Sequence, residues 1–178
     1  MVSYGKSWLK LAHPEYEATR ITFDHEDLRL DAKAAWVRLR REPQHTTLAY
    51  KRRANETIDG MQEVEVVVSD FDKTKMFLEA VGLVVKSEQQ SRREVWELDG
   101  VEIMLDSWPW LDAVVEVEAG SESEVQRVCS VLGLAWSEAI FDSIDGVYIE
   151  VFDVTRTEIC TVPWQFGPVP DWLEAKRR

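Results

Sequence analysis

Two carboxylates in residues 114–118 are spaced so that both would need a cation if they faced the interior of a barrel. The segment reads VVEVE, and because side chains of a strand point alternately to its two faces, Glu116 and Glu118 share one face. Adjacent carboxylates repel each other and add nothing to an apolar core. On a solvated sheet face such a pair has no special meaning, but inside a barrel it needs a cation.

Several basic residues lie on other predicted strands. Arg38 and Arg40 share one face of the predicted strand WVRLR, and Lys51 follows on the next predicted strand. These basic residues could face the same interior as the carboxylates, or they could be surface charges on an amphipathic strand. Arg92 and Arg93 point to opposite faces of a further strand, and either could face inward.

Three more carboxylates lie on predicted strands near these cations. Glu63 and Glu65 share one face of EVEVVV, and Asp106 follows the last residue of a predicted strand over residues 101–105. Each carboxylate could line a ligand site or could only pair with an arginine. The three histidines, His13, His25 and His45, show no metal-ligand spacing.

The elements that would position these residues repeat once along the chain. Residues 63–83 read as a strand, a capped helix and VGL, and residues 116–134 read as a strand, a capped helix and LGL. Each of these two segments is preceded by two predicted strands joined by a turn. The chain therefore resembles two strand–strand–strand–helix copies about fifty residues apart.

The remaining segments complete this outline. Asp99-Gly100 predicts a tight hairpin, because this dipeptide tolerates positive φ. Ser69 or Asp70 could cap the first helix, and Ser121 or Ser123 the second. The other predictions are strands over residues 15–23, 36–40, 46–52, 95–98 and 101–105, one or two helical turns ending before Pro14, a turn over residues 55–60, and polar connections over residues 24–30 and 86–90.

Two such copies can curl together so that the charged faces share one lumen and the helices cover the outer apolar faces. We therefore expect an α+β fold, with an antiparallel barrel or open tunnel of about seven to eight strands and flanking helices. Residues 1–152 are predicted to form the tunnel domain and residues 153–178 a proline-containing tail.

Composition narrows the possible functions. The chain has 178 residues and a net charge of −12, which disfavours a nucleic-acid surface. No apolar run reaches membrane-spanning length. Cys129 and Cys160 form no disulfide or metal pattern, so we expect a cytoplasmic protein without membrane or nucleic-acid partners.

The succession of motifs resembles the CYTH superfamily, which includes class IV adenylate cyclases, thiamine triphosphatases and inorganic triphosphatases. The resemblance covers about residues 21–134, through WVRLRRE, TLAYK, QEVEV, RREVWELDGVEIMLD and VVEVE in this order. It implies an antiparallel tunnel that holds a triphosphate and a divalent metal ion. At the matching positions it implies phosphate binding by Arg38, Arg40, Lys51 and Arg93, Mg²⁺ or Mn²⁺ on Glu116 and Glu118, and a lining of Glu63, Glu65 and Asp106.

This chain departs from the family pattern near its N-terminus. The family's ExExK motif lies on a strand that comes before the match to residues 15–23. Glu15 and Glu17 do not replace it, because Thr19 stands where the lysine belongs. A lysine is also missing from SIDGVYIEVFD, after the second helix. Either the sequence starts late, or part of the metal site is lost.

The resemblance implies a metal-dependent hydrolase of inorganic, thiamine or nucleoside triphosphate, with Glu116, Glu118 and Arg93 as catalytic residues. Phosphoryl transfer depends on positioning and charge neutralisation, so it needs no serine or cysteine nucleophile. A class IV-type adenylate cyclase is one alternative. A triphosphate- or polyphosphate-binding protein without turnover is another, favoured by the missing ExExK strand. An open tunnel exposes a sheet edge that a second copy could cover, so we expect a homodimer.

Overall fold

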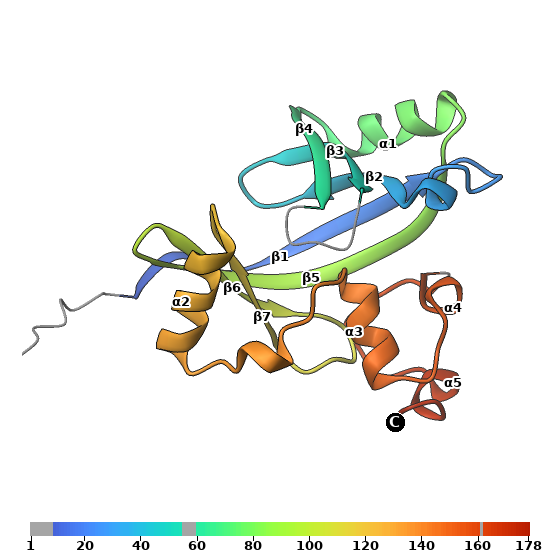
Figure 1. Cartoon of the computed structure of the whole chain (residues 1–178). Coiled ribbons are helices and arrows are strands. Elements are labelled where there is room, and N and C mark those ends of the chain that lie inside the picture. Colours follow the sequence, from blue (N-terminus) through green and yellow to red (C-terminus); the bar gives the residue numbers. More distant parts are fainter. Residues whose placement is uncertain (1–8, 55–59, 161) are drawn as a thin grey trace, which may run out of the picture.

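The candidate residues lie on one curled antiparallel sheet, a half-barrel with helices around it (Figure 1). The structure is a computed structural model that describes residues 9–54, 60–160 and 162–178. Seven strands in these residues follow the order β4-β3-β2-β1-β5-β6-β7, which confirms the predicted α+β fold. The strands are β1 (Lys10–Asp24), β2 (Ala35–Arg41), β3 (Thr46–Arg53), β4 (Met61–Val68), β5 (Val84–Leu98), β6 (Val101–Ser107) and β7 (Val114–Glu118).

Two helix ends lie at residues that favour capping. At the start of α1 the Asp70 side chain accepts a hydrogen bond from the backbone N–H of Lys73, and at the end of α2 Gly133 adopts φ 76°. The helices are α1 (Phe71–Ala80), α2 (Glu122–Leu132), α3 (Ile144–Val151), α4 (Arg156–Cys160) and α5 (Asp171–Glu174), with short 3₁₀ turns at Asp31–Lys33 and Trp136–Glu138.

The predicted internal repeat is present in the fold. Strands β2, β3 and β4 form one antiparallel meander followed by α1, and β5, β6 and β7 form a second one followed by α2. The two meanders lie on either side of β1, which pairs with β2 and β5 (Figure 1). The predicted hairpin at Asp99-Gly100 joins β5 to β6, with φ of 53° and 82°.

In each half of the sheet, the following helix covers part of the outer face. Ile21, Phe23 and Leu39 pack with Phe71 and Leu78 from the α1 segment. On the other half of the sheet, the buried cluster beneath α2 consists of Leu98, Val101, Ile103 and Val128. With these apolar positions on the outer face, the alternate side chains of the same strands point to the concave face.

The N-terminal prediction was wrong. The helical turns expected before Pro14 are the first part of the long strand β1, while residues 1–8 lie outside the described part of the chain. The pairing of β1 with β5 shifts register between Leu11 and His13 and again between His13 and Tyr16. A bulge of this kind accommodates a proline in a strand, because the ladder is interrupted there, and it also bends the strand.

A second correction concerns residues 86–90. They were expected to be a polar connection, but they lie within β5, where Ser87 and Gln89 are buried. The turn predicted over residues 55–60 lies outside the described residues except for Gly60. Among the helices that the structure describes, none has the length and apolar character needed to cross a membrane.

The C-terminal segments pack against the sheet near the end of β6. Trp164 forms a parallel bridge with Gln89 of β5, through hydrogen bonds of 2.9 and 2.8 Å to the neighbouring residues Glu88 and Gln90. Trp108, which follows β6, belongs to the same buried cluster as Tyr148, Phe152, Val154, Ile159, Trp164 and Leu173. This cluster draws side chains from both sides of the predicted domain boundary at residue 152.

Candidate functional site

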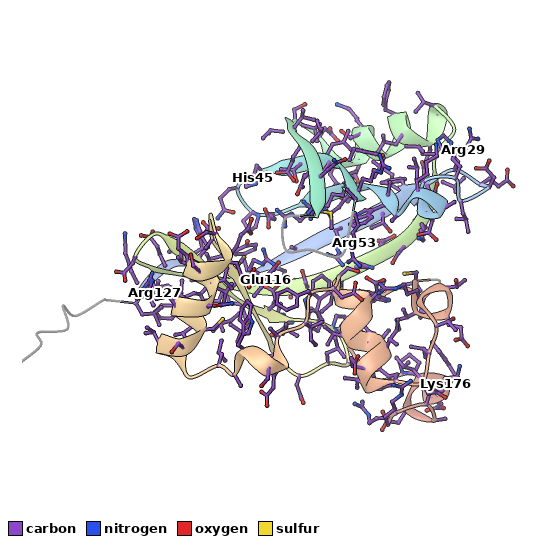
Figure 2. The ribbon with its side chains drawn as sticks, viewed as in Figure 1. Arg29, His45, Arg53, Glu116, Arg127 and Lys176 are labelled. Atoms are coloured by element: carbon purple, nitrogen blue, oxygen red, sulfur yellow. The ribbon has the colours of Figure 1, made fainter. Side chains whose placement is uncertain are left out.

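The predicted phosphate-binding and acidic residues share the concave face of the sheet. On β2, Leu39 packs in the outer core, so Arg38 and Arg40 point to the other side. The register places Ala49 opposite both Arg38 and Glu65, and Lys51 opposite Glu63. Figure 2 shows Glu116 and Arg53 between the two halves of the sheet, and Arg127 and Lys176 at the periphery.

One ion-pair cluster connects β2, β3 and β4. Arg38 Nη2 lies 3.1 Å from Glu63 Oε1 and 3.0 Å from Glu65 Oε2, and Lys51 Nζ lies 2.8 Å from Glu63 Oε2. Burial lowers the pKa values of both Arg38 and Lys51, and other arginines nearby act in the same direction. The two carboxylates therefore only partly compensate the positive charge of this cluster.

A second cluster is centred on Arg93 of β5. Its Nε and Nη2 donate to Asp106 Oδ1 and Oδ2 at 2.7 and 2.5 Å, and Nη2 also lies 2.7 Å from Glu116 Oε2. Burial alone would lower the pKa of Arg93, but these carboxylates outweigh it and raise the pKa. Its neighbour Arg92 instead contacts Glu17 and the Phe166 ring, so Arg93 is the arginine that faces the site.

The structure adds Arg20, which the sequence interpretation missed. Arg20 of β1 lies directly opposite Arg40 of β2 and Gln89 of β5, donates a hydrogen bond to Gln89, and stacks 4.3 Å above the Trp108 ring. Burial, together with the charges of Arg38 and Arg40, lowers the pKa of Arg20 to about 9. The alternation of Arg20 with Ile21 and Phe23 was the signal for its place on the concave face.

Arg40 is close enough to Arg20, Arg38 and Lys51 for its charge to lower the pKa of each of them. Its Nη2 lies 3.5 Å from Glu42 Oε2, a longer separation than in the other pairs. The same Glu42 accepts a 3.1 Å hydrogen bond from Tyr16, and burial and Glu42 raise the pKa of Tyr16 to about 12. The buried Nε atoms of Arg38 and Arg40 have no hydrogen-bond partner within the described residues.

An acidic segment before and within α3 lies beside the concave face. Asp142 pairs with Arg53 of β3 at 2.7 Å and also with Arg156 of α4. Asp145 pairs with Arg156 as well, and its charge acts to raise the pKa of Arg20. These carboxylates were not among the predicted site residues, because they are brought to the sheet by the packing of the C-terminal cluster.

The two predicted metal ligands share a face but differ in their contacts. Glu116 is held by Arg93, whereas Glu118 stands opposite Glu102 of β6 and has no ion pair within the described residues. No group of three or more possible metal-ligating side chains occurs in the part of the chain that the structure describes. Carboxylate oxygens nevertheless suit Mg²⁺ and Mn²⁺, and Mg²⁺ commonly takes only one or two carboxylates together with substrate phosphates. The donor set fits an ion that arrives with a phosphorylated ligand.

Comparisons with known proteins identify the family and the fold. The family model of the CYTH domain matches residues 3–129. Among curated proteins, none matches this chain in sequence. Three similar solved structures illustrate the shared fold. A conserved hypothetical protein from Pyrococcus furiosus is 17% identical with a TM-score of 0.62, and the match covers 76% of this chain and 83% of that protein.

The other two structures come from a bacterium and a plant. A candidate adenylate cyclase from Vibrio parahaemolyticus is 15% identical with a TM-score of 0.57, over 71% of this chain and 72% of that protein. A candidate adenylyl cyclase from Hippeastrum, described as having a dominant triphosphatase activity, is 15% identical with a TM-score of 0.50, over 67% of this chain and 74% of that protein. At these identities the likeness concerns the fold alone.

Proposed function

Because the chain belongs to the CYTH domain family, we propose that it binds a triphosphate on the concave face of the sheet and hydrolyses it with Mg²⁺ or Mn²⁺. The substrate is inorganic triphosphate or the triphosphate group of an organic compound such as thiamine triphosphate or a nucleoside triphosphate. In this proposal Arg20, Arg38, Arg40, Lys51 and Arg93 bind the phosphates.

The observation that carries the proposal is the direct opposition of Arg20 and Arg40 on adjacent strands. Like charges in such a cross-strand pair destabilise a sheet. Here Arg38 is also close enough to lower the pKa of Arg20. The nearby carboxylates of Glu63 and Glu65 already pair with Arg38. A dense polyanion relieves this repulsion and supplies acceptors for the unsatisfied Nε atoms of Arg38 and Arg40.

The residues act mainly by holding and neutralising the triphosphate. Guanidinium groups on both sides of the chain of phosphates fix its position, and they stabilise the charge that spreads over phosphoryl oxygens during transfer. Asp106 keeps Arg93 oriented through two hydrogen bonds. Glu63 holds both Arg38 and Lys51, so these cations are ordered before the ligand arrives.

Glu116 and Glu118 are the residues proposed to hold the metal ion. When bound, a divalent ion supplies charge neutralisation for the phosphates and activation of water. Glu116 is now paired with Arg93, and a phosphate that takes over Arg93 would release this carboxylate. The free thiols Cys129 and Cys160 are compatible with the reducing cytoplasm, where we place this activity.

A second candidate function is triphosphate binding without turnover. It is favoured by the pairing of Glu116 with Arg93 and by the lack of a three-ligand group among the described residues. Both functions predict that tripolyphosphate raises the melting temperature of the protein, because a ligand that binds only the folded state stabilises it. They differ in whether phosphate is released.

The test is phosphate release from tripolyphosphate, ATP and thiamine triphosphate with Mg²⁺ or Mn²⁺, compared with the double variant Glu116→Ala, Glu118→Ala. We expect turnover that is lost in the variant while tripolyphosphate still stabilises it. Stabilisation of the wild type without turnover would support the binding function instead. Formation of cyclic AMP from ATP would identify a cyclase and contradict the hydrolase proposal.

A further inference from the structure

Edge strand β4 carries an unusual number of exposed apolar side chains. In the described residues it pairs with β3 on one side only. On its outer face Val64 and Val66 are 68% and 52% exposed, next to Tyr50 of β3. On α1, Phe77 is also exposed. Exposed edges are commonly protected by charges, prolines or bulges. β4 has no proline, and its two charged residues, Glu63 and Glu65, pair with cations on the concave face, so its outer face carries no charge.

A shallow groove extends this apolar surface toward α1. Its lining combines the strand residues Leu48 and Val68 with the helix residues Phe77, Thr74 and Lys73, and with Asp70 at the helix start. Leu48 lies directly opposite Val66 in the sheet, so the groove borders the exposed valines of β4. A strand added at the edge of β4 would therefore cover these valines and contact the groove.

The charges of β4 restrict how it can pair with a copy of itself. An antiparallel pair centred on Val64 sets Glu63 opposite Glu65, and one centred on Glu65 sets that residue opposite itself. Like charges directly opposite each other destabilise such a pair. A pair centred on Val66 avoids both, since it sets Glu65 opposite Val67 and Val64 opposite Val68.

We propose that β4 pairs antiparallel with β4 of a second copy, centred on Val66, so that two half-barrels form one continuous sheet in a two-fold symmetric dimer. The pairing satisfies the open backbone edge, and the same patch serves both copies, as an isologous interface requires. The outer-face valines of both copies then lie together between the two α1 helices. The concave faces with their ion-pair clusters remain outside the interface.

The first test is the molecular mass of the full chain by sedimentation equilibrium at micromolar concentrations. We expect twice the 20.6 kDa of a single chain. The double variant Val64→Lys, Val66→Lys should weaken the dimer at least tenfold. The matched control is Val131→Lys, which changes an exposed valine on α2 and should leave the dimer intact.

A cysteine cross-link tests the register even if the lysine variant fails to fold. At the two-fold axis a Val66→Cys side chain faces its own copy at a distance that a disulfide can span. Mild oxidation should convert most of this variant to a covalent dimer, above the wild-type background from Cys129 and Cys160. Val131→Cys should stay at that background. A monomeric wild type, or cross-linking of Val66→Cys no stronger than that of Val131→Cys, would overturn the proposal.

Discussion

Arg92 and Arg93 are neighbours in sequence but have opposite environments. Arg93 forms a double hydrogen bond with Asp106, whose side chain is only 5% exposed, while Arg92 pairs with the exposed Glu17. An ion pair that holds a buried carboxylate contributes more to stability than a solvated pair, because removing one partner leaves a buried charge without compensation.

Substitution of these two arginines by glutamine should therefore have very different effects. We expect Arg93→Gln to lower the free energy of unfolding by about 3 kcal/mol, since Asp106 is left buried without its cation. Arg92→Gln should change it by less than about 0.5 kcal/mol. Urea denaturation of both variants measures the difference. Equal losses in the two variants would contradict the assignment of Arg93 to the interior face.

The lowered pKa of Arg20 makes ligand binding depend on pH. The pKa of Arg20, about 9, lies well below the ordinary value of an arginine, so the folded state disfavours the charged form. A bound polyphosphate favours that charged form, and its affinity should therefore be lost as the pH rises through 9. Without ligand the sign is opposite: the unfolded chain keeps this proton to a higher pH, so the free energy of unfolding rises as the pH increases above about 9.

Comparison with Arg20→Gln isolates this effect from the ionisation of the ligand. At about pH 7 the variant should bind tripolyphosphate about tenfold more weakly, because one charge-assisted contact is lost. The difference should shrink toward about pH 10, where wild-type Arg20 has lost much of its charge. Calorimetric titration of tripolyphosphate into both proteins at the two pH values measures this difference in affinity. A tenfold difference that is constant with pH would show that Arg20 does not titrate in this range.

At the residue scale, strand alternation was sufficient to place Arg38, Arg40 and Lys51 on the concave face with Glu63 and Glu65. Alternation alone could not distinguish Arg92 from Arg93, because the choice depends on Asp106 across the β5–β6 pair. The roles of all these residues in binding and catalysis stay predictions until variants are measured.

At the scale of the elements, the local signals that proved reliable were those with a specific backbone requirement. The Asp99-Gly100 turn and the Asp70 cap both lie where they were expected. The first part of β1 was mistaken for a helix because Trp8, Leu9, Leu11 and Ala12 have helical spacing. Its strand conformation depends on pairing with β5, which lies far away in sequence.

The C-terminal segment pairs with β5 through one parallel bridge, and Trp164 anchors it there. This side chain is fully buried, and its Nε1 donates a 2.8 Å hydrogen bond to the Ile159 carbonyl. We expect Trp164→Ala to lower the free energy of unfolding by about 3–5 kcal/mol, as for other large buried aromatic residues. Thermal or urea denaturation provides the measurement.

Trp172 offers a matched control for this prediction. It is 39% exposed on α5, next to the buried Leu173, so Trp172→Ala removes the same side chain type with much less loss of packing. We expect a loss below about 1 kcal/mol. If both variants lost the same stability, the buried cluster around Trp108 and Tyr148 would not be what attaches this segment to the sheet.

At the scale of the whole molecule, net charge and local charge have opposite signs. The chain carries −12 overall, yet its concave face gathers Arg20, Arg38, Arg40, Lys51 and Arg93 from four strands. The acidic exterior disfavours long polyanions such as nucleic acid, while a small ligand can reach the basic interior. The repeat made the clustering of Arg38, Arg40, Lys51 and Arg93 predictable, because two meanders with basic residues at corresponding places can curl around one face. Arg20 lies on β1, outside the repeat, and was missed.

The order of the strands and the packing of the C-terminal segment could not be predicted in the same way. Both depend on contacts between residues that are distant in sequence, such as Tyr16 with Glu42 and Arg53 with Asp142. For that reason the acidic residues beside α3 and the contribution of β1 to the site were missed.

The central claim is that the concave face binds a triphosphate, and the pair Arg40 and Arg41 tests it most directly. Arg40 points to the concave face, whereas Arg41 stacks 4.6 Å above the Phe71 ring on the outer side. The measurement is calorimetric titration of tripolyphosphate into wild type, Arg40→Gln and Arg41→Gln. We predict at least about tenfold weaker binding for Arg40→Gln and wild-type affinity for Arg41→Gln. Equal affinities in all three proteins, or no binding to the wild type, would contradict it.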